Sequence, residues 1–390
     1  SQFSYQTDVD TSFSITPYIR SNSMEFLQHY VPWQPVEKNG HNSIGLQSQL
    51  VQQHGSLNLL SGFDWDQSWG ELSEFQPEAF SATLPQGMHY DYSVTSRVYS
   101  PFVELDWQLS EHTNLLAGLR YEHSELDYNN HLSDGSACAS DVAVCRFIRP
   151  ADTQLTYRQW SNKLALRHQL SHNTTLYAQW SEGYRVPQTS ELFRLQDNQN
   201  TAGLSPEQSQ SIELGLRGNW LSTYFDLSAF YLNKDHVILQ DTHRGLELSL
   251  RSQLTEHFYL AAAGTYAIHR YDSALTISQQ DISANDIDTA PRNMGSIQFG
   301  WQADSGQQIE LEYLSMGRYF LDPENSATYP GHQLLNLRAS TMLTESIKLS
   351  LRLLNLSDQD YAERADIAFG NYRYFVGEPR SVFVTFAFNL

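Results

Sequence analysis

The chain of 390 residues carries 24 Lys and Arg against 44 Asp and Glu, which gives a formal net charge of −20. This balance excludes nucleic acid as a partner, because nucleic acid is bound by concentrated Lys and Arg. No run of about 18 or more apolar residues occurs in the sequence, which excludes transmembrane helices. Membrane-spanning strands are not excluded, since they alternate apolar with polar residues and average out to a polar sequence.

Apolar and polar residues alternate with a period of two in one segment after another. In chain order, the clearest examples are residues 103–107, 246–251, 309–313, 347–353 and 381–390. Successive side chains of a strand point to opposite faces, so each segment has one apolar and one polar face. We expect the charged residues of the polar faces to point into the lumen of a barrel; they are Arg120, Glu122, Arg167, Glu247, Arg251, Glu310, Glu312, Arg338 and Arg352.

The connections between the segments alternate in length. The short ones, which predict hairpin turns, are Ser110–His112, Ser171–Asn173, Thr255–His257, Asp304–Gly306 and Thr344–Ser346. The long polar ones are Leu72–Asp91, Asn130–Thr153, Arg185–Pro206, Asp272–Pro291, Leu321–Gly331 and Ser357–Pro379. Short periplasmic turns and long extracellular loops are typical of outer-membrane barrels.

The sequence therefore predicts an all-β fold, a transmembrane antiparallel up-and-down β-barrel. It contains about 16 full strands plus a partial one at Phe3–Gln6, so about 16–17 in total. No segment shows helical periodicity. Aromatic residues at 13% of the chain fit the aromatic girdles at the two membrane interfaces.

Two cysteines, Cys138 and Cys145, lie in one long polar connection with six residues between them. We expect them to form a local disulfide, because an exposed pair at this spacing is oxidised outside the cytoplasm. Two free surface thiols are the alternative.

Three segments depart from generic barrel sequence. The first is Ser181-Glu-Gly-Tyr-Arg-Val-Pro-Gln-Thr-Ser-Glu-Leu-Phe193, followed by a Leu-Ser-Pro-Glu at 204–207. The second is Leu354-Asn-Leu-Ser-Asp-Gln-Asp-Tyr361, and the third begins with Gly-Glu-Pro-Arg at 377–380. Their distinctive residues are Tyr184, Arg185, Pro187, Glu191, Leu192, Phe193, Asn355, Leu356, Asp358, Tyr361, Gly377, Pro379, Arg380 and Phe388.

In order and spacing, these segments resemble three segments of TonB-dependent receptor barrels, and the final strand resembles the C-terminal assembly signal of outer-membrane barrels. Such barrels have 22 strands around a plugged lumen. The resemblance therefore implies that residues 1–390 form a single barrel domain, the C-terminal part of a receptor barrel whose plug and first strands are missing here. A purely structural reading also exists, since Pro187 and Pro379 can end strand ladders without leaving unpaired donors.

The resemblance further implies an outer-membrane active-transport receptor of a Gram-negative bacterium, with a ferric siderophore or similar iron complex as its cargo. Its expected partners are the TonB–ExbB–ExbD energy-coupling complex, reached through the missing plug, together with outer-membrane lipid and lipopolysaccharide. Haem receptors that resemble this region place a His between the two parts of the first motif. Haem is therefore disfavoured, because residues 188–203 contain no His. Cobalamin, other metals and oligosaccharides stay open as cargo.

Candidate ligand contacts are cations and aromatics in the long loops, which suit an anionic, catecholate-like ligand. They are Arg146, Arg149, Arg185, Arg194, Tyr372, Arg373 and Tyr374. Solvated or interface side chains are the plainer interpretation of each. No spacing among the histidines, such as His236 and His243, matches a metal site. We expect no cofactor, and no catalytic signature indicates an enzyme.

Two other classes of protein compete with this prediction. A passive porin of 16–18 strands fits the chain length well, but the three motif segments argue against it. A soluble β-propeller or sandwich predicts loops of similar length at both ends of the sheet, which the alternating connections contradict.

Overall fold

The computed structural model describes residues 3–6, 10–29, 31–195, 199, 204–235, 241–272, 276–277, 280–368 and 370–388; the terminal Leu390 and His236 lie outside them. Within these ranges, 17 strands belong to one sheet, and the only helix is α1 (Thr189–Phe193). The predictions of an all-β fold and of 16 full strands plus a partial one at Phe3–Gln6 are confirmed. No described helix combines the length and apolar content needed to cross a membrane.

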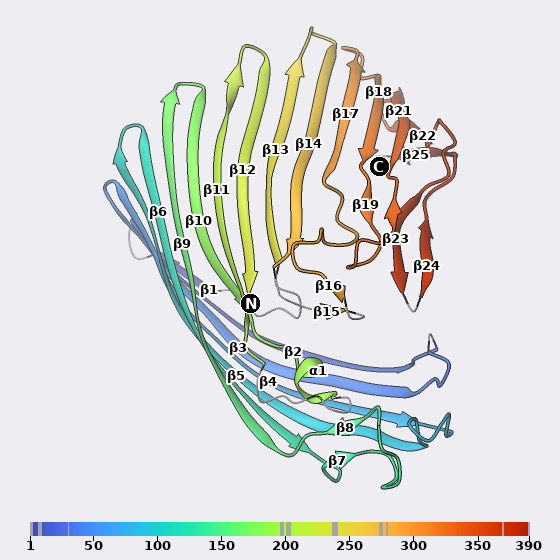
Figure 1. The fold of residues 1–390 in the computed structure, drawn as a ribbon. Coiled ribbons are helices and arrows are strands. Elements are labelled where there is room, and N and C mark those ends of the chain that lie inside the picture. Colours follow the sequence, from blue (N-terminus) through green and yellow to red (C-terminus); the bar gives the residue numbers. More distant parts are fainter. Residues whose placement is uncertain are drawn as a thin grey trace. The chain divides into compact units, whose positions relative to one another are not determined.

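The chain divides into two compact units. Unit 1 comprises Ser1–Leu164 and Ser181–Gln208, and its first six strands each pair antiparallel with the next (Figure 1). These strands are β1 (Phe3–Gln6), β2 (Thr11–Leu27), β3 (Val36–His54), β4 (Leu57–Gln76), β5 (Gly87–Ser110) and β6 (Thr113–Asn130). With 24 residues, β5 is much longer than the roughly 9–11 residues that cross a bilayer, so it continues beyond the membrane.

Unit 2 comprises Ala165–Trp180 and Ser209–Leu390, and eight of its strands also pair antiparallel in succession. These are β12 (Thr223–Asp235), β13 (Asp241–Gln253), β14 (Phe258–Tyr271), β17 (Asn293–Gln302), β18 (Gln308–Met316), β21 (His332–Thr344), β22 (Ile347–Leu354) and β25 (Ser381–Phe388). Three further strands each contribute residues to both units: β9 (Thr153–Ser171), β10 (Thr174–Arg185) and β11 (Glu207–Trp220).

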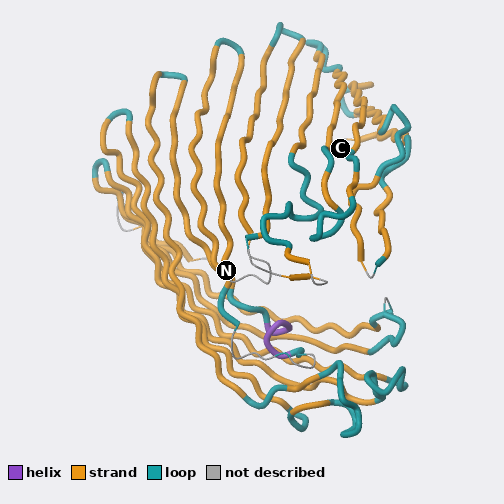
Figure 2. Tube along the Cα trace, viewed as in Figure 1, coloured by secondary structure: helices purple, strands orange, loops and turns teal. Residues whose placement is uncertain are grey.

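The short connections are tight turns at the predicted positions (Figure 2). The long loops differ from prediction, because several contain secondary structure of their own: β7 (Gly135–Ser136), β8 (Ile148–Arg149), β15 (Thr276–Ile277), β16 (Gln280–Asp281), β19 (Tyr319–Phe320), β20 (Thr328–Tyr329), β23 (Ala362–Ala368) and β24 (Asn371–Val376), besides α1. The predicted loop 72–91 is also too long, since β4 and β5 extend into it and leave residues 77–86. The polar residues of this stretch predicted a loop, but those at its two ends belong to strands.

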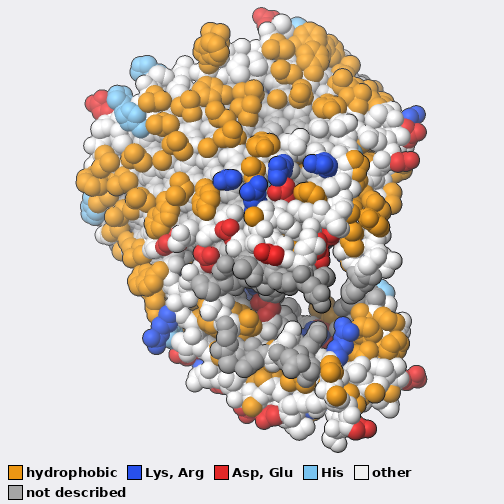
Figure 3. Space-filling model, in the orientation of Figure 1, with side chains coloured by type: hydrophobic (Ala, Val, Ile, Leu, Met, Phe, Trp, Pro, Cys, Tyr) orange, Lys and Arg blue, Asp and Glu red, His pale blue; other side chains and the backbone are white. Residues whose placement is uncertain are grey.

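Alternation gives the sheet an apolar face and a polar face. Large apolar side chains such as Leu246, Ile297 and Phe299 stay exposed, whereas Glu310 and Glu312 point to the opposite side and bond other polar residues. In Figure 3, hydrophobic side chains cover the region of β12–β14 nearest the short turns, and charged side chains follow toward the long loops. A lipid-facing surface needs no protein cover, which explains why so many apolar residues are exposed.

On the polar face, aromatic rings lie over glycines. The ring of Tyr18 covers Gly45, where a Cβ would overlap it, and its hydroxyl donates to Asp66 Oδ2 at 2.6 Å. The guanidinium of Arg20 lies 4.8 Å from the same ring centroid and donates to Asp66 at 2.8 Å. Absence of a side chain at the glycine thus lets an aromatic ring lie flat and reach a carboxylate two strands away.

The same arrangement recurs in unit 2. Tyr177 covers Gly215 and donates to Glu213 at 2.9 Å, and Tyr259 covers Gly300 and donates to Glu310 at 2.6 Å. The polar wall is therefore held by repeated sets of glycine, tyrosine and carboxylate.

We predict that Gly45→Ala destabilises the sheet. A Cβ at this position would lie 2.8 Å from the carbonyl oxygen of Trp65 and displace the Tyr18 ring, and such overpacking costs about 1–3 kcal/mol. The midpoint of urea unfolding, followed in detergent by the loss of heat-modifiable gel mobility, should fall. Gly70→Ala is the control, since its Cβ meets nothing nearer than 3.8 Å. Equal midpoints for the two variants would contradict the proposed role of the ring.

Candidate functional site

Arg185 joins the two ends of the first motif. Its Nε donates to Glu207 at 2.7 Å, and its Nη1 and Nη2 donate to the two oxygens of Glu191 at 3.2 and 3.0 Å. Glu191 also accepts the backbone N–H of Gln188 at 2.7 Å. The guanidinium thus ties the end of β10 to the helix α1 and to the start of β11. The cation predicted as a ligand contact is engaged in holding the loop together.

The helix α1 buries the next two motif residues. Leu192 and Phe193 are both 0% exposed, and the Phe193 ring stacks on Tyr128 of β6 at a centroid distance of 4.2 Å. They belong to a hydrophobic cluster, which we call the loop core, made of Leu84, Tyr90, Tyr92, Val94, Leu126, Tyr128, Cys145, Phe147, Tyr157, Leu192 and Phe193. The loop core packs residues from three long loops of unit 1 against the ends of β5 and β6 that are nearest these loops.

Arg194, one residue beyond α1, bridges two buried carboxylates. Its Nη1 donates to Glu37 of β3 at 3.0 Å and its Nη2 to Glu74 of β4, and its guanidinium lies 5.6 Å from the Tyr90 ring centroid. Glu37 also accepts from Gln28 at 2.8 Å. Because both carboxylates are almost fully buried, this ion pair is of the kind whose disruption is costly.

His89 joins this cluster through both of its ring nitrogens. Its Nδ1 lies 3.1 Å from Glu74 Oε1 and its Nε2 lies 2.8 Å from the carbonyl oxygen of Pro85. The ring thus links Glu74 of β4 to the loop that precedes β5. The ring is 0% exposed and stacks on Phe147 at 3.7 Å. We call the four groups Glu37, Glu74, Arg194 and His89 the buried quartet.

Cys138 and Cys145 form a disulfide with an S–S distance of 2.09 Å, in the loop that also carries two predicted contacts. Arg149 is buried, donates to the carbonyl oxygen of Ser133 at 3.2 Å and has a pKa lowered by burial. Arg146 is exposed and lies over the Trp33 ring at 4.6 Å. Of these two cations, only Arg146 is accessible to a ligand.

In unit 2, the second and third motifs fit into each other. Asn355 has a left-handed backbone (φ 50°); its side-chain amide donates to the carbonyl oxygens of Gln359 and Glu378 at 2.9 and 3.2 Å. Any side chain at Gly377 would overlap the ring of Tyr361, and the Tyr361 hydroxyl accepts the Glu378 N–H at 3.1 Å. The motif residues close the base of the last long loop.

Asp358 and Arg380 complete this closure with an ion pair of 3.1 Å. Tyr361 also packs against His332 of β21, with ring centroids 4.6 Å apart. These contacts join the second motif to the third motif and to β21.

The hairpin β23–β24 carries the last three predicted contacts. Arg373 donates to both oxygens of Asp366, at 2.7 and 3.0 Å, and lowers the pKa of that carboxyl below its usual value. Tyr372 and Tyr374, in contrast, are 61% and 56% exposed. Here again the cation is engaged and the aromatics are free to meet a ligand.

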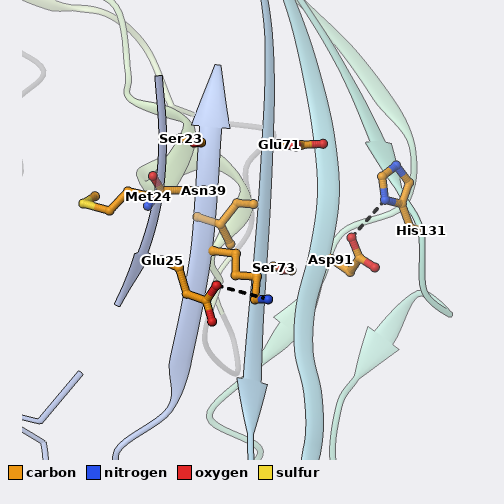
Figure 4. Close-up of a pocket in the computed structure, with 10 residues that line it drawn as sticks. Ser23, Met24, Glu25, Asn39, Glu71, Ser73, Asp91 and His131 are labelled. Carbon is orange, nitrogen blue, oxygen red and sulfur yellow. Dashed lines mark hydrogen bonds and ion pairs between the residues drawn. The ribbon is translucent and has the colours of Figure 1, made fainter. Parts of the chain in front are cut away.

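A cleft of about 450 Å³ opens at the ends of β2–β5 that are nearest the long loops (Figure 4). Its lining is largely polar, and Glu25 pairs with Lys38 at 3.3 Å while Asp91 contacts His131 at 3.0 Å. Glu71 adds a further negative charge. An acidic cleft whose one lysine, Lys38, is already paired with Glu25 is unsuited to an anionic iron complex.

Sequence reasoning missed the partners of its predicted cations: Glu37, Glu74, Glu207, Asp366 and His89. These residues read as ordinary members of polar strand faces and loops, and no local signal pairs them with residues up to 157 positions away. Among the described residues, no group of three or more His, Cys, Asp or Glu is placed to hold a metal ion.

A family model described as TonB dependent receptor-like, β-barrel, matches residues 1–356. The chain belongs to this family. TonB-dependent receptors are transporters of the Gram-negative outer membrane and not enzymes, so the chain is an integral outer-membrane protein, and the predicted β-barrel fold is confirmed.

Solved TonB-dependent receptors show the same fold at low sequence identity. The siderophore receptor PiuA from Acinetobacter baumannii is 13% identical with a TM-score of 0.75, and the ferric yersiniabactin receptor FyuA from Yersinia pestis is 15% identical with a TM-score of 0.73. The ferric citrate transporter FecA is 15% identical with a TM-score of 0.79. Each match covers 99% of this chain, but only 63, 60 and 60% of the respective receptor; the chain spans less than two thirds of their length.

We predict that Arg194→Ala releases the loop core while leaving the barrel assembled. The substitution leaves Glu37 and Glu74 buried without their guanidinium, at a cost of about 3–5 kcal/mol. Hydrogen exchange of residues 186–195 and 131–149 should accelerate, with heat-modifiable mobility unchanged.

Arg146→Ala is the matched control, because Arg146 lies exposed over an aromatic ring. Protection that stays equal in the two variants would show that the buried quartet does not hold the loops.

Acid should loosen the same loop through Glu191, whose pKa is lowered chiefly by its hydrogen bonds from Arg185. A depressed folded-state pKa means that the contribution is complete above the ordinary value of 4.5 and is lost as pH falls through the lowered value. The protection factors of residues 186–195, which correct for the intrinsic pH dependence of exchange, should therefore be constant from pH 7 to about 5 and fall below about pH 4. Glu191→Gln should remove this step, and Glu78→Gln should keep it; an unchanged profile in Glu191→Gln would contradict the assignment.

Proposed function

We propose that this protein is an active-transport receptor that takes up a ferric siderophore or a similar iron complex with energy from TonB. The observation that carries the proposal is the family match over residues 1–356. Solved receptors of the same fold are named for siderophore, ferric yersiniabactin and ferric citrate transport, which makes an iron complex the first choice of cargo. A copper transporter, OprC, also shares the fold with a TM-score of 0.76 and 16% identity over 96% of this chain, so metal complexes other than iron are the second choice.

The family match argues against a passive porin. The loop core supports the same conclusion, because three long loops of unit 1 are fixed by buried contacts to the polar face of their own strands. A fixed loop surface suits recognition of one ligand, since less conformational entropy is lost on binding.

The accessible predicted contacts are Arg146, Tyr372 and Tyr374, and we propose that these meet the cargo. The remaining candidates, Arg149, Arg185, Arg194 and Arg373, position the loops. Exposed tyrosines provide flat, amphipathic surfaces that stack on aromatic ligand groups at low entropic cost.

We also propose the partners and the domain. All 390 residues would form one barrel domain, with a plug domain outside this sequence transmitting energy from the TonB–ExbB–ExbD complex. The apolar face would contact membrane lipid and lipopolysaccharide.

In cells lacking their own iron receptors, the complete receptor should restore uptake of radiolabelled iron from at least one ferric siderophore in a panel. The uptake should disappear when TonB is deleted, because passive diffusion cannot drive accumulation. Uptake that persists without TonB would favour a porin and contradict the proposal.

In the same assay, the double substitution Tyr372→Ala, Tyr374→Ala should raise the KM for uptake about tenfold, or 1.4 kcal/mol, with normal assembly. Val376→Ala is the control, since Val376 is exposed on the same hairpin. An unchanged KM in the double variant would remove the tyrosines from the ligand surface.

A further inference from the structure

Two histidines on the polar face of unit 2 bring equivalent ring nitrogens together. His243 of β13 and His269 of β14 are register partners, and their Nδ1 atoms share a hydrogen bond of 2.7 Å. The rings are tilted by 61° with centroids 5.0 Å apart. They are 26 residues apart in sequence, so only the pairing of the two strands makes them neighbours.

The contacts behind His243 are incomplete as they stand. Its Nε2 lies 3.3 Å from Asp241 Oδ1, yet both atoms are buried and lack a hydrogen-bond partner of good geometry. Other charges nearby are engaged: Lys234 lies 3.6 Å from Asp241, and Asp286 pairs with Arg292 at 2.7 Å. The carboxylate of Asp241 thus lies directly behind the distal nitrogen of His243, and a small adjustment of the ring would let it accept a hydrogen bond from that nitrogen.

The same pair of nitrogens also suits a metal ion. Imidazole nitrogens bind metals at about 2.0–2.1 Å, so two nitrogens on one ion stand about 3 Å apart, and the rings need to part by only a few tenths of an ångström. A carboxylate behind the distal nitrogen is the usual device that fixes the tautomer and orientation of a ligating histidine. Asp241 occupies that position relative to His243.

We propose that His243 and His269 form a docking position for a chelated divalent transition-metal ion of the copper, nickel or zinc class. Two imidazoles supply only two ligands, and the described residues offer no third that would close a site. An ion that two imidazoles hold keeps other ligands of its own, so the matching partner is a complex with two adjacent exchangeable positions. Imidazole favours these ions, whereas magnesium and calcium prefer oxygen ligands. A ferric siderophore with all six positions filled offers none, so the docking position extends beyond the iron cargo of the proposed function.

Copper(II) iminodiacetate is a suitable probe, because its chelator leaves coordination positions open for two imidazoles. Titrated into the purified, tag-free protein in detergent, it should bind at one equivalent. The electron paramagnetic resonance spectrum should show coupling to two imidazole nitrogens. His243→Ala and His269→Ala should each weaken binding at least about tenfold and leave coupling to one nitrogen or none.

His257→Ala is the matched control, since His257 is an exposed histidine in a turn of the same unit, and it should leave the tight site intact. Asp241→Asn should weaken binding by about 10–100-fold while keeping two-nitrogen coupling. Equal binding by the wild type and both histidine variants would overturn the proposal, as would a wild-type spectrum without a second imidazole nitrogen. The wild-type spectrum decides even where a variant fails to fold. Because binding is measured without transport, this result is independent of whether TonB-driven iron uptake is found.

Discussion

Everything in this structure depends on one constraint: each strand has an apolar face for lipid, so its polar side chains must satisfy one another on the other face. Burying a polar group without a partner is costly. On the polar face, neighbouring side chains therefore pair with one another: Arg338 donates to Glu310 at 2.7 Å and to Glu312 at 2.6 Å. Tyrosines laid over glycines extend the same pairing across strands. Other arginines of this face, such as Arg251 and Arg352, lie over aromatic rings instead.

Pairing between arginines and carboxylates also holds the long loops, and the motif residues take part in it. Arg185 and Arg194 lie where a ligand-binding cation was expected, but acidic residues from strands and loop surround both. Motif glycine, asparagine and tyrosine at the last loop likewise close a turn by fitting into each other. The motif residues therefore fold the loops, which agrees with the proposal that side chains outside the motifs, such as Tyr372 and Tyr374, meet the cargo.

The sequence was sufficient for the fold because its signal is local. Period-two alternation and turn spacing determine strands, faces and connection lengths without knowledge of distant contacts. The predicted strand number and turn positions are therefore confirmed, and the errors lie in the loops, where α1 and hairpins such as β23–β24 form. Short elements of this kind depend on tertiary packing, as the complete burial of Leu192 and Phe193 shows.

The site was harder to predict because its contacts join residues far apart in sequence. Nothing local pairs Arg194 with Glu37, or His243 with His269; strand register and loop packing create both. Register has a further consequence for function. A shift of one residue between β13 and β14 would move His269 to the apolar face and separate the two imidazoles, whereas the alternation of Leu246, Leu248 and Leu250 against lipid holds that register in place. The apolar face thus determines, through the pleat, which polar groups meet on the opposite side.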